Sequence, residues 1–257
     1  LPPKTVTMDD KDVQKDLNSD TAVYVMEIEP DAVAMSVGFR AEDQPVFVDG
    51  ERMAIKIGKI ESEPTKKPQM ELLVANDIVK MLNKNNAEAI ARVQDTAFLK
   101  LCNAAVEAET EAQVVHADTT NAITRLVLTK TMNIITGAEL VPDKWLMSDR
   151  EWNKLLASPL SEIDNLAGVI FKDGLQEKRL LGLPVETSVK STLFTADENG
   201  SIYLFAAPEF LGKIIKIGTD KMWSKWERDI FHWTSWRYIG MGFGDTRGIA
   251  RLDLSTA

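Results

Sequence analysis

The chain has 257 residues, of which 44% are apolar and 27% charged, enough for one large globular domain or two small ones. One cysteine and two histidines exclude an intrachain disulfide and leave little material for a zinc site or a histidine-based catalytic triad. No apolar run approaches the roughly 20 residues of a membrane-spanning helix, so we expect no membrane partner. The net charge of −9 would repel phosphates, which argues against sequence-specific recognition of nucleic acid.

The acidic residues are concentrated at the start of the chain. The first fifty residues carry eleven acids against four bases, so they hold most of the net charge. Two interpretations of residues 1–20 stay open: a solvated terminal arm, or an arm that docks on a neighbouring subunit. The chain begins with leucine, and a start methionine is normally trimmed only before small residues, which points to proteolytic processing or a truncated sequence.

Residues 21–69 are predicted to form strands. The β-rich segments are Tyr24–Glu29, Val46–Val48 and Arg52–Ile57, and the dipeptide Asp49-Gly50 between the last two is a strong hairpin signal. An extended arm of about ten residues reaches about 33 Å. A domain of this length has a radius of gyration of only about 18 Å. The hairpin therefore either folds back on its own body or projects onto another molecule.

The segment Gln69–Thr136 contains no glycine or proline, and its apolar residues recur at helical spacing. Asn83–Asn86 interrupts the pattern, and Asn86 is a candidate cap for a second helix. If the two runs are continuous, the helix exceeds thirty residues and is about 45 Å long. A further helix is predicted from Thr119 or Thr120 through Ile135, with Gly137 as its C-cap.

All six tryptophans lie in the second half of the chain. Short strands are predicted there at 169–171, 185–189, 202–205, 214–217 and 249–254. Residues 230–239 fit either a helix or a strand, and their aromatic richness favours a strand. Strands followed by helices and then by mixed elements predict an α+β fold.

No catalytic motif is apparent. Gly240–Gly244 lies too close to the end of the chain for a dinucleotide fingerprint, and we expect a turn or bulge beside a closely packed strand. Gly212-Lys213 lacks the following hydroxyl residue of a phosphate-binding loop. His232 is predicted to be a packed strand residue and Cys102 a small buried apolar one. We therefore expect no enzyme, cofactor or metal, and a small carboxylate- or metal-dependent enzyme is the alternative from a different class.

Four segments, in order, resemble the major capsid proteins of tailed bacteriophages, the family with the Hong Kong 97-type fold. The likeness is by order and spacing and covers roughly residues 70–255. Its segments are Ile78–Leu99, Trp145–Leu155, Leu181-Gly182-Leu183-Pro184-Val185, and Glu227–Asp229 through Arg251–Leu254.

The resemblance implies a division of the chain into four parts. These are an N-terminal arm at 1–20, strands with an extended hairpin called the E-loop at 21–69, a peripheral domain with a long spine helix at 70–143 and 237–257, and an axial domain at 144–236. The over-long hairpin around Asp49-Gly50 is then the E-loop, lying across a neighbouring subunit, and the acidic start is the intersubunit arm. Leu1 then marks removal of a scaffolding segment.

The resemblance also implies a function. Such subunits self-assemble into hexamers and pentamers that form an icosahedral shell around packaged double-stranded DNA, and they reside in the virion capsid after assembly in the host cytoplasm. Further implied partners are scaffolding, portal and decoration proteins and a maturation protease. An encapsulin-type nanocompartment shell is the alternative within the same fold.

Nine residues are candidates for contacts between subunits: Asp49, Gly50, Lys56, Lys59, Lys66, Lys67, Trp152, Trp223 and Trp226. Some relatives cross-link a hairpin lysine to an asparagine of a neighbour. The best-matching position in the final strands is Thr234, so we do not expect a covalent cross-link.

Overall fold

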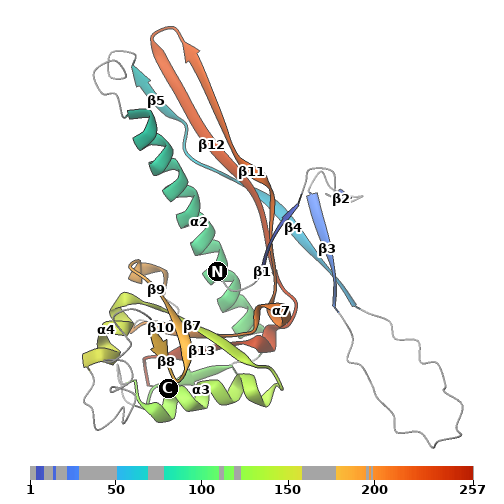
Figure 1. The fold of residues 1–257 in the computed structure, drawn as a ribbon, viewed down its shortest axis with the longest axis vertical. Coiled ribbons are helices and arrows are strands. Elements are labelled where there is room, and N and C mark those ends of the chain that lie inside the picture. The colour runs from blue at the N-terminus through green and yellow to red at the C-terminus, as the bar shows by residue number, and fades with distance from the viewer. Residues whose placement is uncertain are drawn as a thin grey trace, which may run out of the picture.

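The computed structural model describes residues 4–8, 14–15, 22–28, 51–68, 78–109, 113–118, 123–157, 178–194, 197 and 199–256. Two β-sheets and one long helix dominate these parts (Figure 1). The first sheet contains β1 (Lys4–Met8), β2 (Gln14–Lys15), β3 (Ala22–Ile28), β4 (Glu51–Glu61), β5 (Thr65–Pro68), β11 (Gly212–Glu227) and β12 (Ile230–Phe243). The second contains β6 (Val114–His116), β7 (Pro142–Ser148), β8 (Arg179–Leu180), β9 (Leu183–Ser188), β10 (Ser201–Ala206) and β13 (Ile249–Asp253).

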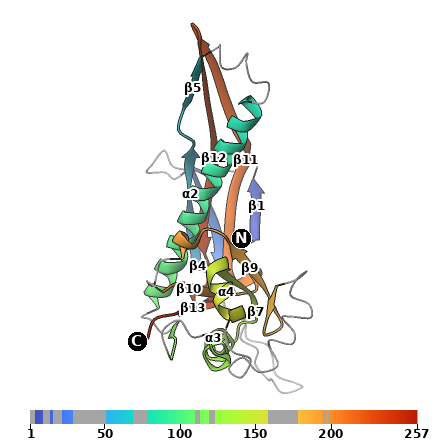
Figure 2. The same cartoon turned by 90° about the vertical axis from the view of Figure 1, so that its left-hand side faces the viewer.

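The helices are α2 (Ile78–Ala108), α3 (Arg125–Gly137), α4 (Asp149–Ala157) and α7 (Pro208–Leu211), with short 3-10 turns at Ser191–Leu193 and Thr246–Gly248. In both views α2 runs alongside the long β11–β12 hairpin, and the second sheet with α3 and α4 lies at its base (Figures 1 and 2). The α+β class predicted from the sequence is confirmed.

The helix α2 is continuous over 31 residues. Asn86 lies inside it and is buried, so it does not cap a second helix as the sequence suggested. Its neighbours on the buried stripe, Leu82 and Ile90, lie four residues away on either side, which places all three on one face. The helix therefore runs unbroken along β12.

The helix α3 begins later and ends differently than predicted. Its N-cap is Thr124, whose Oγ1 accepts a hydrogen bond from the Val127 N–H at 3.4 Å. Gly137 is still helical, and the left-handed position falls on Glu139, with φ of 61°. The Leu140 N–H donates to Ile135 O at 3.2 Å and the Glu139 N–H to Thr136 O at 3.0 Å, which is a Schellman end. Gly137 is thus two residues away from the position that favours glycine.

The main core lies between the second sheet and the helices packed on it. All six residues of β10 are buried, because this strand is central in the order β6-β13-β10-β7-β9-β8. Tyr203 and Phe205 of β10, with Trp145 of β7, are fully buried there. Cys102 of α2 joins the same cluster, so its predicted burial is confirmed.

The ambiguous residues 230–239 belong to strand β12, as their aromatic content favoured. Its partner β11 pairs with it from Gly212–Phe243 to Glu227–Ile230. The predicted strand at 169–171 and the segment 46–50 lie outside the described residues.

The region 51–61 has partners that the sequence did not indicate. Residues 51–56 of β4 pair with β3, and residues 57–61 pair with β12, so this part folds back on its own body. Residues 4–8 pair in parallel with β11 of the same chain, so within a single subunit they are not a solvated arm.

The strand pairing also groups the chain differently from the predicted domains. The predicted boundary at 236/237 falls inside β12, and β13 belongs to the second sheet together with β7, β9 and β10. The pairing is between residues distant in sequence, which spacing alone does not encode.

Glycines allow the strands to cross closely. A Cβ on Gly242 would lie 2.7 Å from Ile55 Cγ1, and one on Gly240 would lie 3.0 Å from Lys56 O, so β4 crosses the sheet where these side chains are missing. Both glycines lie in β12, which continues to Phe243 where the sequence suggested a turn or bulge. Gly212 is the tightest position, with φ of 138° and a neighbouring backbone on the opposite strand.

We expect Gly212→Ala to destabilise the subunit by about 2 kcal/mol or more, because the new methyl group would collide with the Gly242 carbonyl oxygen and lie 2.8 Å from Phe243 Cα. Urea unfolding followed by circular dichroism measures this loss. Gly58→Ala is the matched control, since a Cβ there meets nothing within 4 Å. Equal unfolding midpoints for the two variants would contradict the close approach of Gly212 to the backbone of Gly242 and Phe243.

Candidate intersubunit surface

The outer part of the β11–β12 hairpin, residues 218–236, projects from the body and is called here the distal hairpin (Figures 1 and 2). It begins at a bulge, where the pairing register shifts between Ile217 and Lys221 and Gly218 has φ of 60°. Every residue from 218 to 230 is exposed in the single chain. Such a projection is stable only if one of its faces is supported.

The support comes from α2 and from aromatic packing on one face. Phe231 and Trp233 are at least nine-tenths buried on this face. The ring centroids of Trp226 and Phe231 are 4.8 Å apart, and those of Phe231 and Trp233 are 5.4 Å apart. These contacts form a continuous aromatic row, which ends at the exposed Trp226.

Four large apolar side chains of the distal hairpin remain at the surface. Their exposed fractions are 58% for Met222, 47% for Trp223, 52% for Trp226 and 42% for Ile230. By cross-strand register, Met222 and Trp226 lie on the face toward α2, whereas Trp223 and Ile230 lie on the opposite face. A cluster of exposed aromatic and aliphatic side chains on a projecting element is typical of a protein–protein contact.

A charged clamp holds the base of the distal hairpin. Arg237 Nε and Nη2 each donate to the carboxylate of Asp220 at 2.5 Å, and Arg237 Nη1 donates to Gln94 Oε1 of α2 at 2.8 Å. The hydrogen bonds and charge of Arg237 lower the pKa of Asp220, and Asp220 in turn raises the pKa of Arg237. The clamp thus links the bulge of β11, the strand β12 and the helix.

A second anchor joins the β4–β5 connection to β12. The Ser62 N–H donates to Ser235 O at 2.8 Å, and the Ser235 N–H donates to Ser62 Oγ at 3.0 Å. Thr234 Oγ1 lies 3.2 Å from Ser62 O and 3.3 Å from Glu61 Oε1. Thr234 is therefore a buried structural residue of this junction.

The predicted lysines do not gather in one place. Lys56 is exposed on β4, while Lys59 bonds Glu61 at 2.5 Å and lies 5.0 Å from the ring centroid of Trp236. Lys66 is exposed and Lys67 half-buried on β5, which pairs with the distal hairpin. Asp49 and Gly50 lie outside the described residues.

Of the three predicted tryptophans, Trp223 and Trp226 are at the surface, whereas Trp152 is in the core. It is 5% exposed because the amphipathic helix α4 turns it toward the second sheet. It therefore cannot serve as a surface contact in this fold. Sequence reasoning missed Met222 and Ile230, although both flank the two exposed tryptophans within the same hairpin.

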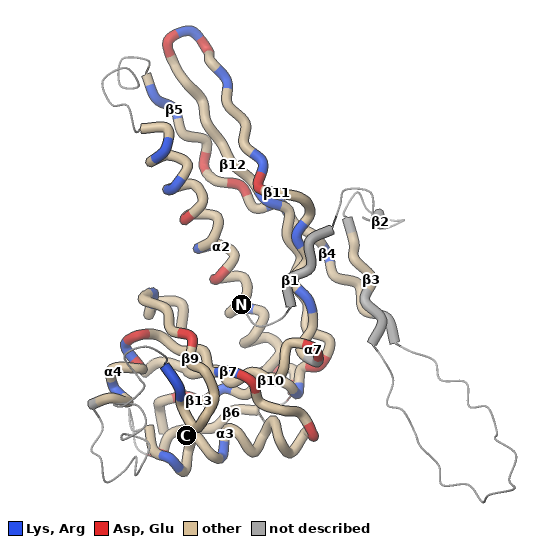
Figure 3. The backbone as a smooth tube through the Cα atoms, viewed as in Figure 1, with Lys and Arg blue, Asp and Glu red and all other residues tan. Residues whose placement is uncertain are grey.

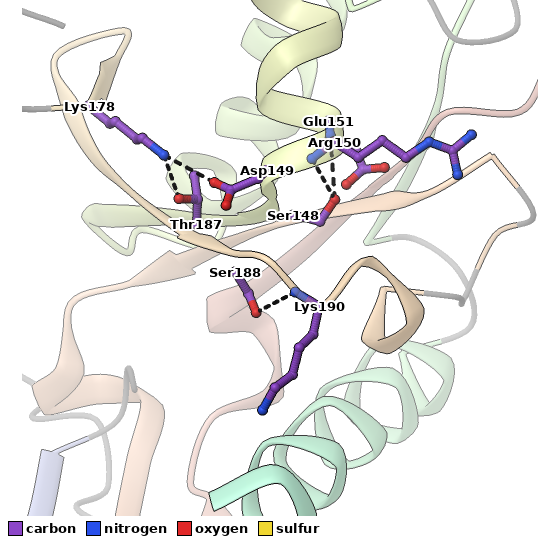
Figure 4. A network of polar contacts seen from close by, with 8 residues as sticks. All are labelled: Ser148, Asp149, Arg150, Glu151, Lys178, Thr187, Ser188 and Lys190. Atoms are coloured by element: carbon purple, nitrogen blue, oxygen red, sulfur yellow. Dashed lines mark hydrogen bonds and ion pairs between the residues drawn. The ribbon is translucent and has the colours of Figure 1, made fainter. Parts of the chain in front are cut away.

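A polar network fixes α4 to the β8–β9 hairpin (Figure 4). Lys178 Nζ lies 3.1 Å from Asp149 Oδ1 and 2.6 Å from Thr187 Oγ1. The hydrogen bonds from Thr187 and Lys178 lower the pKa of Asp149. Ser148 Oγ accepts from the Glu151 N–H at 3.4 Å and so caps the start of α4. These contacts are explained by the fold of a single subunit, in which they hold α4 against the β8–β9 hairpin.

The described part of the chain offers little for catalysis. His232 is a half-buried strand residue, as predicted, with its Nε2 3.4 Å from Glu227 Oε2. Burial raises the pKa of the Cys102 thiol, which disfavours a nucleophilic thiolate. Among the residues that the structure describes, no three His, Cys, Asp or Glu side chains are grouped to hold a metal ion. Within the same ranges, no helix combines the length and apolar character needed to cross a bilayer.

The comparisons with known proteins identify the fold. No protein-family model matches the chain, and no curated protein matches its sequence. A structure from Microbacterium phage Oxtober96, 9% identical, covers 97% of this chain and 88% of its own at a TM-score of 0.68. The capsid of the native GTA particle is 11% identical, and the match covers 98% of this chain and 88% of that chain at a TM-score of 0.62. The mature capsid of bacteriophage PhiM1 is 11% identical, and the match covers 98% of this chain and 85% of that chain at a TM-score of 0.59.

We expect Asp220→Asn to weaken the clamp and lower the free energy of unfolding by up to about 1 kcal/mol at neutral pH, because the pair is partly exposed. Since the pKa of Asp220 is lowered in the folded chain, its contribution is present above the ordinary carboxyl value of 3.8 and is lost as the pH falls through the lowered value.

Urea unfolding of both proteins at neutral pH and at about pH 3 tests this expectation, because the difference between them must shrink on acidification. Asp229→Asn, at the exposed tip of the same hairpin, is the control. A difference that is constant with pH would show that Asp220 does not act through its charge.

Proposed function

Because the chain has the fold of phage capsid proteins, we propose that it is a major capsid subunit that self-assembles into hexamers and pentamers of an icosahedral shell around double-stranded DNA. The observation that carries the proposal is the distal hairpin, with four large apolar side chains exposed on a projection that a single chain leaves uncovered. Copies of the subunit would cover them.

The elements of the structure support particular roles within such a shell. The helix α2, with the β11–β12 sheet beside it, would be the spine helix of the peripheral domain. The second sheet, with α3 and α4, would be the axial domain, so β13 would belong to the axial domain rather than to the peripheral one. The β3–β4 pair would be the base of the E-loop, because residues 51–56 pair with β3 away from the rest of the sheet (Figure 1).

The charge of the subunit is more consistent with the wall of an enclosing shell than with a DNA-binding surface. The net charge is −9, and in Figure 3 acidic and basic residues are interspersed along the distal hairpin rather than separated. A shell with this charge would enclose a polyanion without binding it strongly. Stability would then come from several interfaces, each on the order of 1,500 Å². The proposal gives the subunit a structural role without catalysis.

We expect the double variant Trp223→Ser/Trp226→Ser to remain folded but to lose closed shells, because both side chains are about half exposed in the single chain and would be buried between subunits. Negative-stain microscopy of the full chain should show uniform hollow particles for the parent and unassembled subunits or capsomers for the variant.

The matched control is Val93→Ser, which removes an exposed apolar side chain from α2 outside the distal hairpin. It should leave the particles unchanged. Absence of any particle from the parent chain, under conditions where it is folded, would refute the proposed function. Normal shells from the double variant would remove the distal hairpin from the list of contacts.

We also expect that replacing residues 30–49 with a short glycine-serine linker leaves a folded subunit that assembles poorly. The described strands β3 and β4 keep all their paired residues in this variant, so thermal unfolding of the free subunit should change little. Particle yield by microscopy should fall strongly. A large loss of thermal stability in the free subunit would argue that this segment serves the subunit's own fold.

A further inference from the structure

Along one edge of β11, the strands of the described ranges pair only with its inner part. The hairpin partner β12 occupies one edge along the whole strand, whereas β1 covers the other edge only over Lys213–Ile217. From Lys221 to Glu227 no strand of the described ranges pairs with that second edge. Figure 1 shows β11 on the outer side of the distal hairpin, with β5 on the opposite side of β12. An exposed edge of this length is a template for another strand.

We propose that residues 221–227 of β11 pair antiparallel with the same residues of a second copy, about a twofold axis at Ser224. This inference rests on the proposed function, since it names one contact between subunits of the shell. The contact is isologous, with the same edge contributed by both copies. It would join two distal hairpins into one continuous sheet across the axis.

Self-complementary side chains support this register. An axis at Ser224 places Lys221 opposite Glu227 of the copy, so both ends of the contact have an opposite-charge pair. It also places Met222 opposite Trp226, two exposed apolar side chains on the same face. Trp223 falls opposite Lys225, an arrangement that allows cation–π contact. Each of the large apolar side chains of β11 thus meets a compatible partner.

The neighbouring registers are disfavoured by charge. In an antiparallel pair, two opposed residues turn their backbone groups either both toward each other or both away. Opposed residues in two copies of one strand are therefore an even number of positions apart, so the twofold axis passes through a residue and moves in whole-residue steps. An axis at Trp223 would place Lys221 opposite Lys225 of the copy, and an axis at Lys225 would place that lysine opposite itself. Like charges directly opposite each other destabilise a sheet. Among these three registers, the sequence of the strand selects Ser224.

The pairing is compatible with the structure of each subunit. The edge points away from β12 and β5, so neither strand has to move. Lys221 lies 5.5 Å from the ring centroid of Tyr238, and Glu227 lies 3.4 Å from His232, both on the face opposite α2. On that face the two charged side chains can also reach across the edge.

Charge exchange tests the register. In the full-length protein, Lys221→Glu and Glu227→Lys each place like charges opposite each other, and we expect each to reduce the yield of closed particles about tenfold. The double variant Lys221→Glu/Glu227→Lys restores opposite charges in reversed order, and its yield should recover. Lys66→Glu, an exposed lysine on the other side of the distal hairpin, is the control and should assemble normally.

Thermal unfolding of the free subunits separates a contact defect from a folding defect. The single variants should unfold within a few degrees of the parent, because their charges are exposed. A double variant that assembles no better than the two single variants would overturn the register. So would single variants that assemble as well as the parent.

Cysteine cross-linking tests the axis directly. Opposed residues of antiparallel strands have Cα atoms about 4.5–5.5 Å apart, within the range of a disulfide. Ser224→Cys should therefore form a covalent dimer in oxidised particles, detected on a non-reducing gel. The native Cys102 is fully buried and gives no background. Thr219→Cys, exposed on the same strand but five residues from the axis, should not cross-link.

The outcomes distinguish this inference from the proposed function. Hollow particles of Ser224→Cys without a cross-link, or equal cross-linking of both cysteine variants, would refute the strand pairing and leave the shell function standing. A folded parent protein that forms no particle at all would refute the shell function itself. Particles with a dimer specific to Ser224→Cys support both.

Discussion

The packing of α2 against one face of the β11–β12 hairpin is the contact on which the rest of the structure depends. A two-stranded hairpin is marginal in water, and beyond its base the distal hairpin has only the four-residue strand β5 beside it among the described strands, so it needs an apolar surface to lie on. The buried stripe of α2 and the aromatic residues Phe231 and Trp233 supply it on one side only. On the opposite face Trp223 and Ile230 are exposed, and no strand of the described ranges pairs with the outer edge of β11 over residues 221–227. Support on a single side therefore makes the hairpin both stable and available to other molecules.

Local backbone features decide where the hairpin leaves the body. The bulge after Ile217 bends β11, and the clamp between Asp220 and Arg237 fixes that bend against Gln94 of the helix. Below the bulge, Gly242 lets β4 cross the sheet in close contact. The direction of the projection thus follows from a few residues whose backbone or charge is unusual. In a closed shell, such a direction would set where one subunit meets the next.

Only part of the candidate contact surface was predictable from the sequence. Trp223 and Trp226 were identified as contact candidates and are exposed, whereas Trp152 had the same aromatic signal and lies in the core. Periodicity within a helix or strand states which side chains share a face, but burial depends on what covers that face. Met222 and Ile230 were missed for the same reason, because an isolated apolar residue in a strand is expected from the sequence to be buried in the core.

The sequence by itself determined the helical character of residues 78–108, the α+β class and the strand character of the aromatic segment, because these depend on spacing and propensity within a few turns or residues. It also contains Lys221, Trp223, Lys225 and Glu227 at every second position, the spacing that places them on one face of a strand. Only the tertiary structure decided that β1 pairs with β11 over Lys213–Ile217 and that α2 covers one face of the hairpin. Those partners are far from β11 in the chain, and contacts between distant segments are set by the packing of the whole subunit. The uncovered edge of β11 and the uncovered face of the hairpin could therefore be recognised only from the folded structure.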